Sequence, residues 1–497
     1  MAPWIFPIAL QPDSCEPVYL QITRAISADI LRGRLAPGTA LPGSRTLAKT
    51  LGVHRNTVLA AYRELQAQGW TEPLPRSTRV SAAPPLASAW EPGALREVLG
   101  FPLEPAAPPT LCELPRRPGT LTFGTGLPDL RLMATEELAR AYARALRNRS
   151  LLGYGDPKGE HHLRTALASL LSGLRGLTVA VDQLMVVGGS QMALDLVART
   201  LFRPGDRVAV EDPGYAPAWT TLRYAGVELV PIRVDAGGLR VDLLEAELGR
   251  RPVRALYCTP HHQFPTTVTL APDRRRRLLE LARLHRMAVL EDDYDFEFPF
   301  EGSPAPPLAS ADQGGVVVYM GSLSKVVAPG LRLGFVAGPR ALVDALAMRR
   351  YAADRQGDQV LERAMAELLE DGLVQRHVRK MLRIYQARRT VLAEALEREL
   401  GSAVSFTLPT GGMSLWLSAD PALDVEAWAA AAERHGVQFY PGRHFDFRGR
   451  SRPNLRLGFS TLGEDELLEG VRRLQAALRE DGVRSPVQPG LIAPAGR

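Results

Sequence analysis

From about residue 119 to residue 480, short apolar runs alternate with longer amphipathic segments. We predict strands over residues 184–187, 207–210, 228–232, 255–259, 287–291, 316–320 and 333–337. Helical periodicity falls between many of these runs, notably over residues 190–201, 273–285 and 339–351. Strands that alternate with helices predict an α/β fold whose mostly parallel sheet is covered on both faces. In such sheets ligands bind beyond the carboxyl ends of the strands.

The chain has 497 residues, more than one hydrophobic core usually supports, and its composition changes along its length. Residues 1–80 are helix-patterned and predict a small, mainly α domain. Residues 81–118 are rich in Pro and Ala and predict a semi-rigid linker. Residues 119–480 predict the large α/β domain, and residues 481–497 predict a loose tail.

Membrane, export and disulfide signals are weak throughout the sequence. No stretch approaches the roughly 20 apolar residues that a membrane-spanning helix needs. The N-terminal apolar run has no basic region before it and contains two prolines, so it is a poor signal peptide. Cys15, Cys112 and Cys258 are widely spaced and odd in number, which predicts neither a disulfide framework nor a metal site. We therefore expect a cytoplasmic protein without a membrane partner.

The N-terminal domain carries the spacing of three short helices. Apolar side chains recur at helical spacing from Val18 to Leu31. We expect Ser44 to cap a second helix that Gly52 ends, and His54 to open a third helix that runs to about residue 68. Two helices joined by a tight turn that contains glycine predict a helix-turn-helix motif.

The second helix of that motif begins with side chains suited to reading DNA bases. Arg55, Asn56 and Thr57 lie at its N-terminal end, which enters the major groove in such motifs. The other predicted DNA contacts are Ser44, Arg45 and Thr46 on the preceding helix, and Arg76 and Arg79 on a wing over residues 70–81. Residues 1–80 hold nine Lys or Arg against five Asp or Glu, as a nucleic-acid-binding domain would. A three-helix packing unit with a solvated basic surface explains the same spacing and charge.

Lys325 stands in the segment GSLSKVVAPGLRLG, directly after a predicted buried strand. Ser322 and Ser324 place hydroxyl groups before the lysine, and Arg332 follows it by seven residues. An aldehyde cofactor with a phosphate needs such a set, because the amine forms an imine while the hydroxyls and the guanidinium bind the phosphate. A surface lysine is the ordinary alternative, and the rigid PGLRLG segment argues against it.

Other residues at the predicted carboxyl edge complete such a site. Asp292 follows a strand and can keep the pyridine nitrogen of the cofactor protonated, and Tyr294 can reach the phenolic oxygen. Gly189, Ser190 and Gln191 follow a strand and open a helix, which predicts an anion cradle. The remaining predicted contacts are Tyr215 stacked on the pyridine ring, Tyr154 at the phosphate and Arg456 at a carboxylate of an effector.

Ordinary alternatives exist for these residues too. Asp292 belongs to EDDYDFEF, which a charged loop also explains, and the remaining acidic residues of that segment are expected to be solvated or structural: Asp293, Asp295 and Glu297. Tyr215 is equally an ordinary turn aromatic, and Arg456 is equally a strand-edge arginine.

Six motifs, YGDPKG, EDPGY, TPHHQFPT, EDDYD, SLSK…PGLRLG and RLGFS, occur in the order found in fold type I aminotransferases, which residues 120–480 therefore resemble. Residues 17–70 resemble the winged helix of the GntR family, and the combination resembles its MocR-type subgroup. The resemblance implies pyridoxal 5′-phosphate (PLP) held as an internal aldimine on Lys325, with Asp292 at the pyridine nitrogen and Arg332 at the phosphate. It also implies a homodimer that binds double-stranded operator DNA, and it leaves open that Tyr154 serves the partner's site.

Three positions depart from the family patterns. PRSTRVS replaces the Gly-Ser-Gly-Thr tip usual in GntR wings. Phe264 stands where working aminotransferases have an Asn that binds the phenolic oxygen of the cofactor, and an aromatic there resembles the regulator subgroup. Thr267 replaces the Gly of the same turn.

These features favour a regulator in which an amino-acid or amine effector displaces Lys325 from the cofactor, and Arg456 grips a carboxylate if the effector has one. No catalytic turnover is expected, because Phe264 argues against it. The alternative is a competent aminotransferase that carries a DNA-binding domain. A third hypothesis is a regulator whose cofactor site is vestigial, or one that senses PLP itself.

Overall fold

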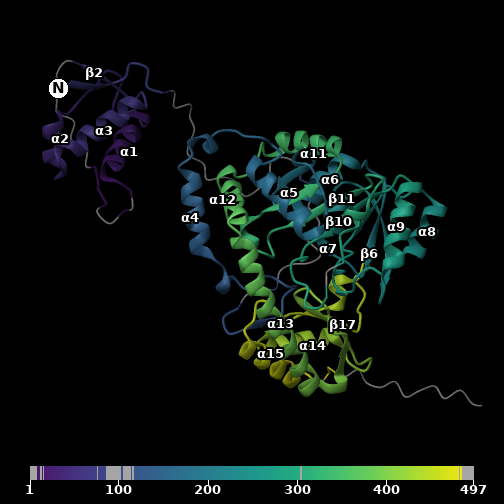
Figure 1. The fold of residues 1–497 in the computed structure, drawn as a ribbon. Coiled ribbons are helices and arrows are strands. Elements are labelled where there is room, and N and C mark those ends of the chain that lie inside the picture. Colours follow the sequence, from purple (N-terminus) through teal and green to yellow (C-terminus); the bar gives the residue numbers. More distant parts are fainter. Residues whose placement is uncertain are drawn as a thin grey trace, which may run out of the picture. The chain divides into compact units, whose positions relative to one another are not determined.

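The computed structural model describes residues 8–11, 14, 16–74, 77–85, 102–103, 114, 117–302, 305–480 and 482–483 (Figure 1). The chain divides into two compact units, residues 1–106 and residues 107–497. The expected linker and tail boundaries stay predictions, because most of residues 81–118 and 481–497 lie outside the described residues, as does Arg76.

The N-terminal unit is three helices and a small antiparallel sheet. Its elements are α1 (Val18–Leu31), β1 (Ala40–Leu41), α2 (Ser44–Leu51), α3 (Arg55–Ala67), β2 (Thr71–Leu74) and β3 (Ser77–Val80), with strand order β1-β3-β2. Ile22 and Ile26 of α1 pack against Val58 and Leu65 of α3 in one buried core. This arrangement confirms the winged helix-turn-helix fold.

Three helix caps in this unit can be compared with those expected from the sequence. Gly52 ends α2 in the left-handed conformation, with φ of +67°, as expected. Ser44 does not cap α2, which corrects our expectation: the N-cap is Gly43, and Ser44 is the first helical residue. His54 caps α3, because its Nδ1 accepts a hydrogen bond from the main-chain N–H of Asn56 at 3.2 Å. The imidazole therefore takes the role that a Ser or Asp usually has at this position.

The larger unit is built on one eight-stranded sheet. Its strands are β5 (Leu184–Val187), β6 (Arg207–Asp212), β7 (Glu228–Asp235), β8 (Gly238–Leu239), β9 (Ala255–Cys258), β10 (Ala288–Asp293), β11 (Val317–Ser322) and β12 (Gly334–Ala337), in the order β5-β12-β11-β10-β9-β6-β7-β8. Neighbours from β11 through β7 are parallel, whereas β12 runs antiparallel to both β11 and β5. All seven predicted strands are present, and the mostly parallel α/β fold is confirmed.

Helices cover both faces of this sheet (Figure 1). The helices α6 (Ser190–Leu201), α7 (Ala216–Tyr224) and α11 (Arg340–Ala353) pack on one face. The opposite face is covered by α5 (His161–Arg175), α8 (Val241–Arg250) and α9 (Pro272–Leu284). Successive residues of β6 point to opposite sides, since Val208 belongs to the core under α6 and Ala209 to the core under α8.

A second, smaller layer follows the main sheet, and the sequence did not indicate it. Four antiparallel strands in the order β13-β14-β17-β16 form it: β13 (Val404–Phe406), β14 (Ser414–Ala419), β16 (Tyr440–Pro441) and β17 (Asn454–Gly458). The helices α13 (Leu373–Leu400), α14 (Val425–Arg434) and α15 (Glu464–Ala477) pack on it around the buried Trp428. Beside it, β4 (Leu121–Thr122) pairs in parallel with β15 (Val437–Gln438).

The remaining helices of the larger unit are α4 (Thr135–Leu146), α10 (Leu308–Ala311) and α12 (Gln359–Glu370), and α4 and α12 pack in the same core as α5. Short 3-10 turns lie at Leu130–Leu132, Arg149–Leu152, Val181–Gln183, Pro329–Leu331, Gly401–Ala403 and Gly442–Phe445. Among the described residues, none of the helices has the length and apolar character needed to cross a bilayer.

Candidate functional site

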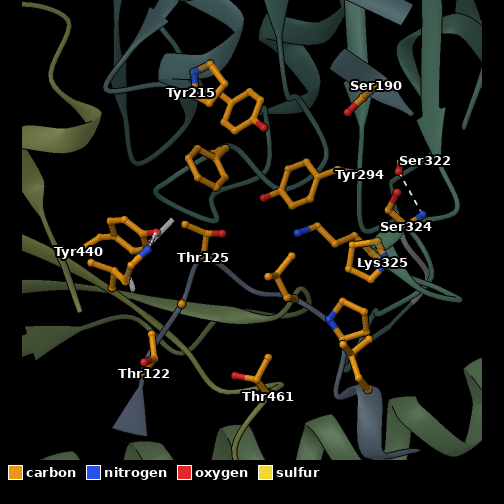
Figure 2. A pocket seen from close by; sticks show the side chains of 18 of the residues that line it. Thr122, Thr125, Ser190, Tyr215, Tyr294, Ser322, Ser324, Lys325, Tyr440 and Thr461 are labelled. Carbon is orange, nitrogen blue, oxygen red and sulfur yellow. Dashed lines mark hydrogen bonds between the residues drawn. The ribbon is translucent and has the colours of Figure 1, made fainter. Parts of the chain in front are cut away.

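A cavity of about 670 Å³ opens at the carboxyl ends of the parallel strands (Figure 2). Nine of the predicted cofactor contacts line it: Ser190, Gln191, Tyr215, Asp292, Tyr294, Ser322, Ser324, Lys325 and Arg332. They come from five separate stretches of the chain that the sheet brings to one edge. Gly189, Tyr154 and Arg456 are not among the lining residues.

Lys325 extends into this cavity from the loop after β11. Its Nζ donates a hydrogen bond to the main-chain oxygen of Gly126 at 2.6 Å. Asp292 lies on the neighbouring strand β10, in register with Met320 of β11. The parallel pairing of β10 and β11 therefore brings an amine and a carboxylate to the same edge.

Asp292 is buried, and only one of its two oxygens is satisfied by the protein. Oδ2 accepts a hydrogen bond from the hydroxyl of Tyr257 at 2.7 Å. Oδ1 is buried without a hydrogen-bond partner among the described residues. Burial raises the pKa of Asp292 to about 6. An N–H donor or a cation beside Oδ1 would offset that cost, and the protonated pyridine nitrogen of PLP has this chemistry.

The anion cradle forms where β5 meets α6. Gly189 has φ of +87°, and a Cβ at this position would lie 2.8 Å from Nη2 of Arg332. The positive φ favours glycine, and the missing side chain leaves room for the guanidinium beside the start of α6. The first-turn N–H groups of a helix have no helical partner and suit an anion. Arg332 is itself held by a hydrogen bond from Nη2 to the main-chain oxygen of Gly188 at 2.6 Å.

The serines before Lys325 complete this cradle (Figure 2). The hydroxyl of Ser322 accepts a hydrogen bond from the main-chain N–H of Ser324 at 3.1 Å. The hydroxyl of Ser324 is buried and has no hydrogen-bond partner among the described residues. The Ser324 hydroxyl, the Arg332 guanidinium and the N-terminus of α6 fit the phosphate of PLP. The half-satisfied carboxylate of Asp292 fits its pyridine ring.

Aromatic rings form the next wall of the cavity. The hydroxyl of Tyr215 accepts a hydrogen bond from Nε2 of Gln191 at 3.4 Å, and burial raises its pKa to about 12. The hydroxyl of Tyr294 donates to the main-chain oxygen of His262 at 2.9 Å. Phe264 meets Tyr215 edge to face, with 5.0 Å between ring centroids. The turn that departs from the aminotransferase pattern thus places an aromatic ring on the cavity.

Arg456 lies behind Phe264 rather than on the cavity surface. Its guanidinium carbon is 4.5 Å from the centroid of the Phe264 ring, and the residue is 1% exposed. Nε and Nη2 both donate to the main-chain oxygen of Thr125, at 3.3 and 3.2 Å, and Nη1 donates to that of Pro265. Tyr154 is 81% exposed, and within this chain it contacts Arg355, whose guanidinium carbon lies 4.2 Å above its ring.

The three acidic residues that follow Asp292 have structural roles. Of the two roles expected for them, exposure to solvent is wrong. Asp293 and Glu297 form ion pairs with the buried Arg175, and Asp295 pairs with His262 at 2.8 Å. All three carboxylates belong to buried or half-buried residues. Their charges therefore pair with cations inside the protein.

The expected DNA-reading residues lie together at one end of the helix-turn-helix. Arg45 and Thr46 of α2, and Arg55 and Asn56 of α3, are exposed, whereas Ser44 and Thr57 are half-buried. Nε of Arg55 donates to the hydroxyl of Ser44 at 3.3 Å, which ties the two helix starts together. On the wing, Arg79 is paired with Glu72 at 3.2 Å, so its charge is partly neutralised.

Several cavity residues gave no signal in the sequence. Tyr257 positions Asp292, and its strand is otherwise a plain apolar run. Leu114, Arg117 and Tyr440 line the outer part of the cavity, although two of them fall in the stretch expected to be linker. No local pattern marks these residues, because each acquires its role from contacts with distant parts of the chain.

Comparisons with known proteins agree with this two-part organisation. The model for class I and II aminotransferases matches residues 120–474, and the model for bacterial regulatory proteins of the gntR family matches residues 18–79. The probable rhizopine catabolism regulatory protein MocR of Rhizobium meliloti is 32% identical over 497 residues, which cover 98% of this chain and 100% of that protein. The HTH-type transcriptional regulator TauR of Rhodobacter capsulatus is 34% identical over 477 residues, which cover 92% of this chain and 96% of that protein.

Solved structures resemble the larger unit. The α-aminoadipate aminotransferase LysN of Thermus thermophilus, complexed with N-(5′-phosphopyridoxyl)-L-leucine, superposes with a TM-score of 0.68 at 32% identity. The match covers 73% of this chain and 92% of that enzyme. The chain therefore belongs to the GntR family of bacterial regulators, in the MocR-type group that joins a winged helix to a PLP-dependent aminotransferase domain of class I and II.

Proposed function

We propose that this protein is a PLP-dependent transcription regulator that binds operator DNA through its winged helix and detects a small amine carrying a carboxylate. The observation that carries the proposal is the pairing of a lysine and a half-satisfied aspartate in one cavity, with a buried arginine behind it that forms no ion pair among the described residues. We infer that the protein acts in the cytoplasm, where operator DNA lies.

Each cavity residue has a part in holding the cofactor. Lys325 supplies the amine, Asp292 a carboxylate for the pyridine nitrogen, and Arg332 with Ser322 and Ser324 a phosphate cradle. PLP, when bound, supplies an aldehyde carbon that bonds reversibly to a primary amine. Lys325 would be the group that an effector amine replaces there, and its released amine would accept the proton that the effector amine loses.

Arg456 stands apart from the other buried arginines, which supports a carboxylate on the effector. Five other arginines are at most 7% exposed, and each forms an ion pair with a carboxylate: Arg164, Arg175, Arg350, Arg388 and Arg389. Arg456, at 1% exposure, forms no ion pair among the described residues. An isolated buried charge is costly, and a ligand anion would relieve the cost. Burial lowers the pKa of Arg456, and Tyr294 and Asp295 offset this only in part.

Phe264 supports sensing over turnover. Its ring covers the guanidinium of Arg456 and contributes no hydrogen-bond donor to the cavity, where a reacting aminotransferase would need one for the phenolic oxygen of the cofactor. We infer that ligand exchange at Lys325 is the useful event and that multiple turnover is slow or absent.

Exposed apolar side chains on the larger unit support a homodimer. Leu152, Tyr154, Met348 and Tyr351 are between 46% and 81% exposed, and Arg355 contacts both tyrosine rings. Such a group of apolar side chains is typical of an interface. Two winged helices in one dimer would then reach two operator half-sites.

DNA binding tests the regulatory role directly. Full-length protein is titrated onto the DNA upstream of its own gene, with and without PLP and with a panel of amino acids. We expect sequence-specific binding that PLP or one amino acid changes at least fivefold. Failure to bind specifically, together with release of ketoacid over many turnovers, would show that the protein is an enzyme.

Two carbonyl reagents test the carboxylate preference. Aminooxyacetate and methoxyamine both capture the aldehyde of PLP, and only the first carries a carboxylate. We expect the PLP-loaded protein to react at least tenfold faster with aminooxyacetate than with methoxyamine. Arg456→Gln should remove that difference. The control Arg254→Gln changes an exposed arginine outside the cavity and should keep it. Equal rates in the unmodified protein would refute the role of Arg456.

A further inference from the structure

Leu114 forms part of the effector cavity, although it belongs to the stretch that leads in from the DNA-binding unit. Its side chain lines the cavity and packs on the aromatic cluster, which we define as Phe264, Tyr440 and Phe445. Its main-chain N–H donates a hydrogen bond to the hydroxyl of Tyr440 at 3.0 Å. Tyr440 is only 4% exposed, so this bond ties Leu114 to a rigid part of the larger unit.

The residues that follow Leu114 continue along the same wall. Arg117 lines the cavity and pairs with Glu433 of α14 at 2.9 Å. Thr120 and Thr122 also line it, and β4 is fixed by its pairing with β15. In Figure 2, Tyr440 and Thr122 lie on the opposite side of the view from Ser190, Ser322 and Ser324. The serines form the phosphate cradle, so Leu114, Arg117, Thr120 and Thr122 belong to the end of the cavity that an effector would fill.

The aromatic cluster connects Leu114 with the proposed carboxylate site. Tyr440 of β16 lies opposite Arg456 of β17 in antiparallel register. Phe264 covers Arg456, and its ring centroid is 5.6 Å from that of Phe445. Phe445 in turn lies edge to face with Tyr440 at 6.3 Å. A carboxylate that reaches Arg456 must move the Phe264 ring, which is packed in the same cluster as Leu114.

We propose that Leu114 and Tyr440 are specificity-determining residues for the effector, because they wall the end of the cavity away from the phosphate cradle. The proposal rests on the proposed function, since it names how the same cavity selects its ligand. A small effector fits inside the wall that Leu114 forms, whereas the Leu114 side chain opposes a long or bulky one.

The size test uses the PLP-loaded full-length protein and two probes that differ only in bulk, methoxyamine and O-benzylhydroxylamine. We expect Leu114→Ala to speed capture of the benzyl probe at least tenfold and to leave capture of methoxyamine within twofold. Leu114→Trp should slow the benzyl probe by a similar factor. The control is Leu408→Ala, a partly exposed leucine that does not line the cavity and should change neither rate. Parallel changes for both probes in the Leu114 variants would overturn the proposal.

Docking is tested separately, without cofactor or probe. Hydrogen exchange is followed by mass spectrometry in the peptide that contains Leu114, in the full-length protein and in Tyr440→Phe, which removes the acceptor of the Leu114 N–H. We expect exchange at least tenfold faster in Tyr440→Phe and unchanged exchange in the control Tyr142→Phe, whose ring does not line the cavity. Equal exchange in all three proteins would overturn the docking. If neither probe reacts with any protein, the proposed function fails, and the exchange result still decides whether Leu114 is docked.

Discussion

Tyr257 donates a hydrogen bond to Oδ2 of Asp292 at 2.7 Å and thereby leaves Oδ1 as the one oxygen of that carboxylate without a partner among the described residues. The two residues lie on neighbouring strands, β9 and β10, so the sheet itself fixes the direction of the carboxylate. The tyrosine satisfies half of the buried group, and the remaining half is available to a ligand.

The first prediction concerns this carboxylate. Asp292→Asn should weaken PLP binding by roughly 10- to 100-fold, because a neutral amide cannot stabilise a protonated pyridine nitrogen. A hydrogen bond to a charged group contributes about 1.5–3 kcal/mol, which corresponds to this loss. The measurement is a titration of the apoprotein with PLP, followed by the absorbance of the lysine-bound cofactor. Asp312→Asn, a change outside the cavity, is the control and should bind PLP normally. Unchanged affinity in Asp292→Asn would remove this residue from the site.

The second prediction concerns Glu211 and pH. Burial raises the pKa of Glu211 from 4.5 to about 7, although Thr259 and Gln263 donate hydrogen bonds to it. The folded state therefore holds the proton more tightly than the unfolded state, and the contribution of this group to stability falls as pH rises from 4.5 through 7. Glu211→Gln does not titrate, so it should gain stability relative to the unmodified protein as pH rises, by up to about 3 kcal/mol.

Urea unfolding of both proteins at pH 5 and pH 8 measures this difference. Glu291, whose pKa burial also raises to about 7, is present in both proteins, so its contribution cancels in the comparison. If the difference in unfolding free energy between the two proteins is the same at pH 5 and pH 8, the pKa of Glu211 is the same in the folded and unfolded states.

The third prediction concerns the turn that carries Phe264. Thr267 has φ of +63°, a left-handed conformation that is strained for a β-branched residue. Thr267→Gly should raise the free energy of unfolding by roughly 0.5–1 kcal/mol, after allowance for the greater chain entropy of glycine. Thermal or urea unfolding measures the gain. The control is Thr266→Gly in the same turn, which should lower the free energy of unfolding because the Thr266 hydroxyl donates a hydrogen bond to Gln263 at 2.6 Å. A loss of stability in Thr267→Gly would show that the hydroxyl or methyl of Thr267 is needed.

The fourth prediction concerns the winged helix. Arg55→Ala should weaken specific binding to the operator by roughly 10- to 100-fold, because one good contact from an arginine to a base is worth about 1–3 kcal/mol. Arg32→Ala removes the same charge from the C-terminal end of α1 and serves as the control. Fluorescence anisotropy at two salt concentrations measures both variants. An equal loss in the two variants would indicate that Arg55 acts only through its charge.

The sequence predicted the buried parallel strands well and the outer layer poorly. Strands such as β5 and β9 are buried along their whole length and therefore appear as continuous apolar runs. Two strands of the second sheet are very short: β13 spans only Val404–Phe406 and β16 only Tyr440–Pro441, and no periodicity can emerge over so few residues.

The candidate site divides in the same way. Lys325, Asp292 and Arg332 stand in short sequence motifs, so local patterns identified them although their partners in the fold are distant in sequence. Leu114 and Tyr440 are 326 residues apart, and only the folded chain brings them together. The same limit explains why solvation was considered for the acidic segment: Arg175, which neutralises Asp293, lies 118 residues earlier.

The position of Leu114 also bears on how such regulators can be recombined. A chimera that exchanges DNA-binding domains at the start of the aminotransferase-like match, near residue 120, would import a foreign residue into the ligand cavity of the recipient. Junctions placed before residue 114 keep the native wall and should preserve the response to the original inducer. Junctions placed after it should produce hybrids that bind DNA but answer to a shifted range of small molecules.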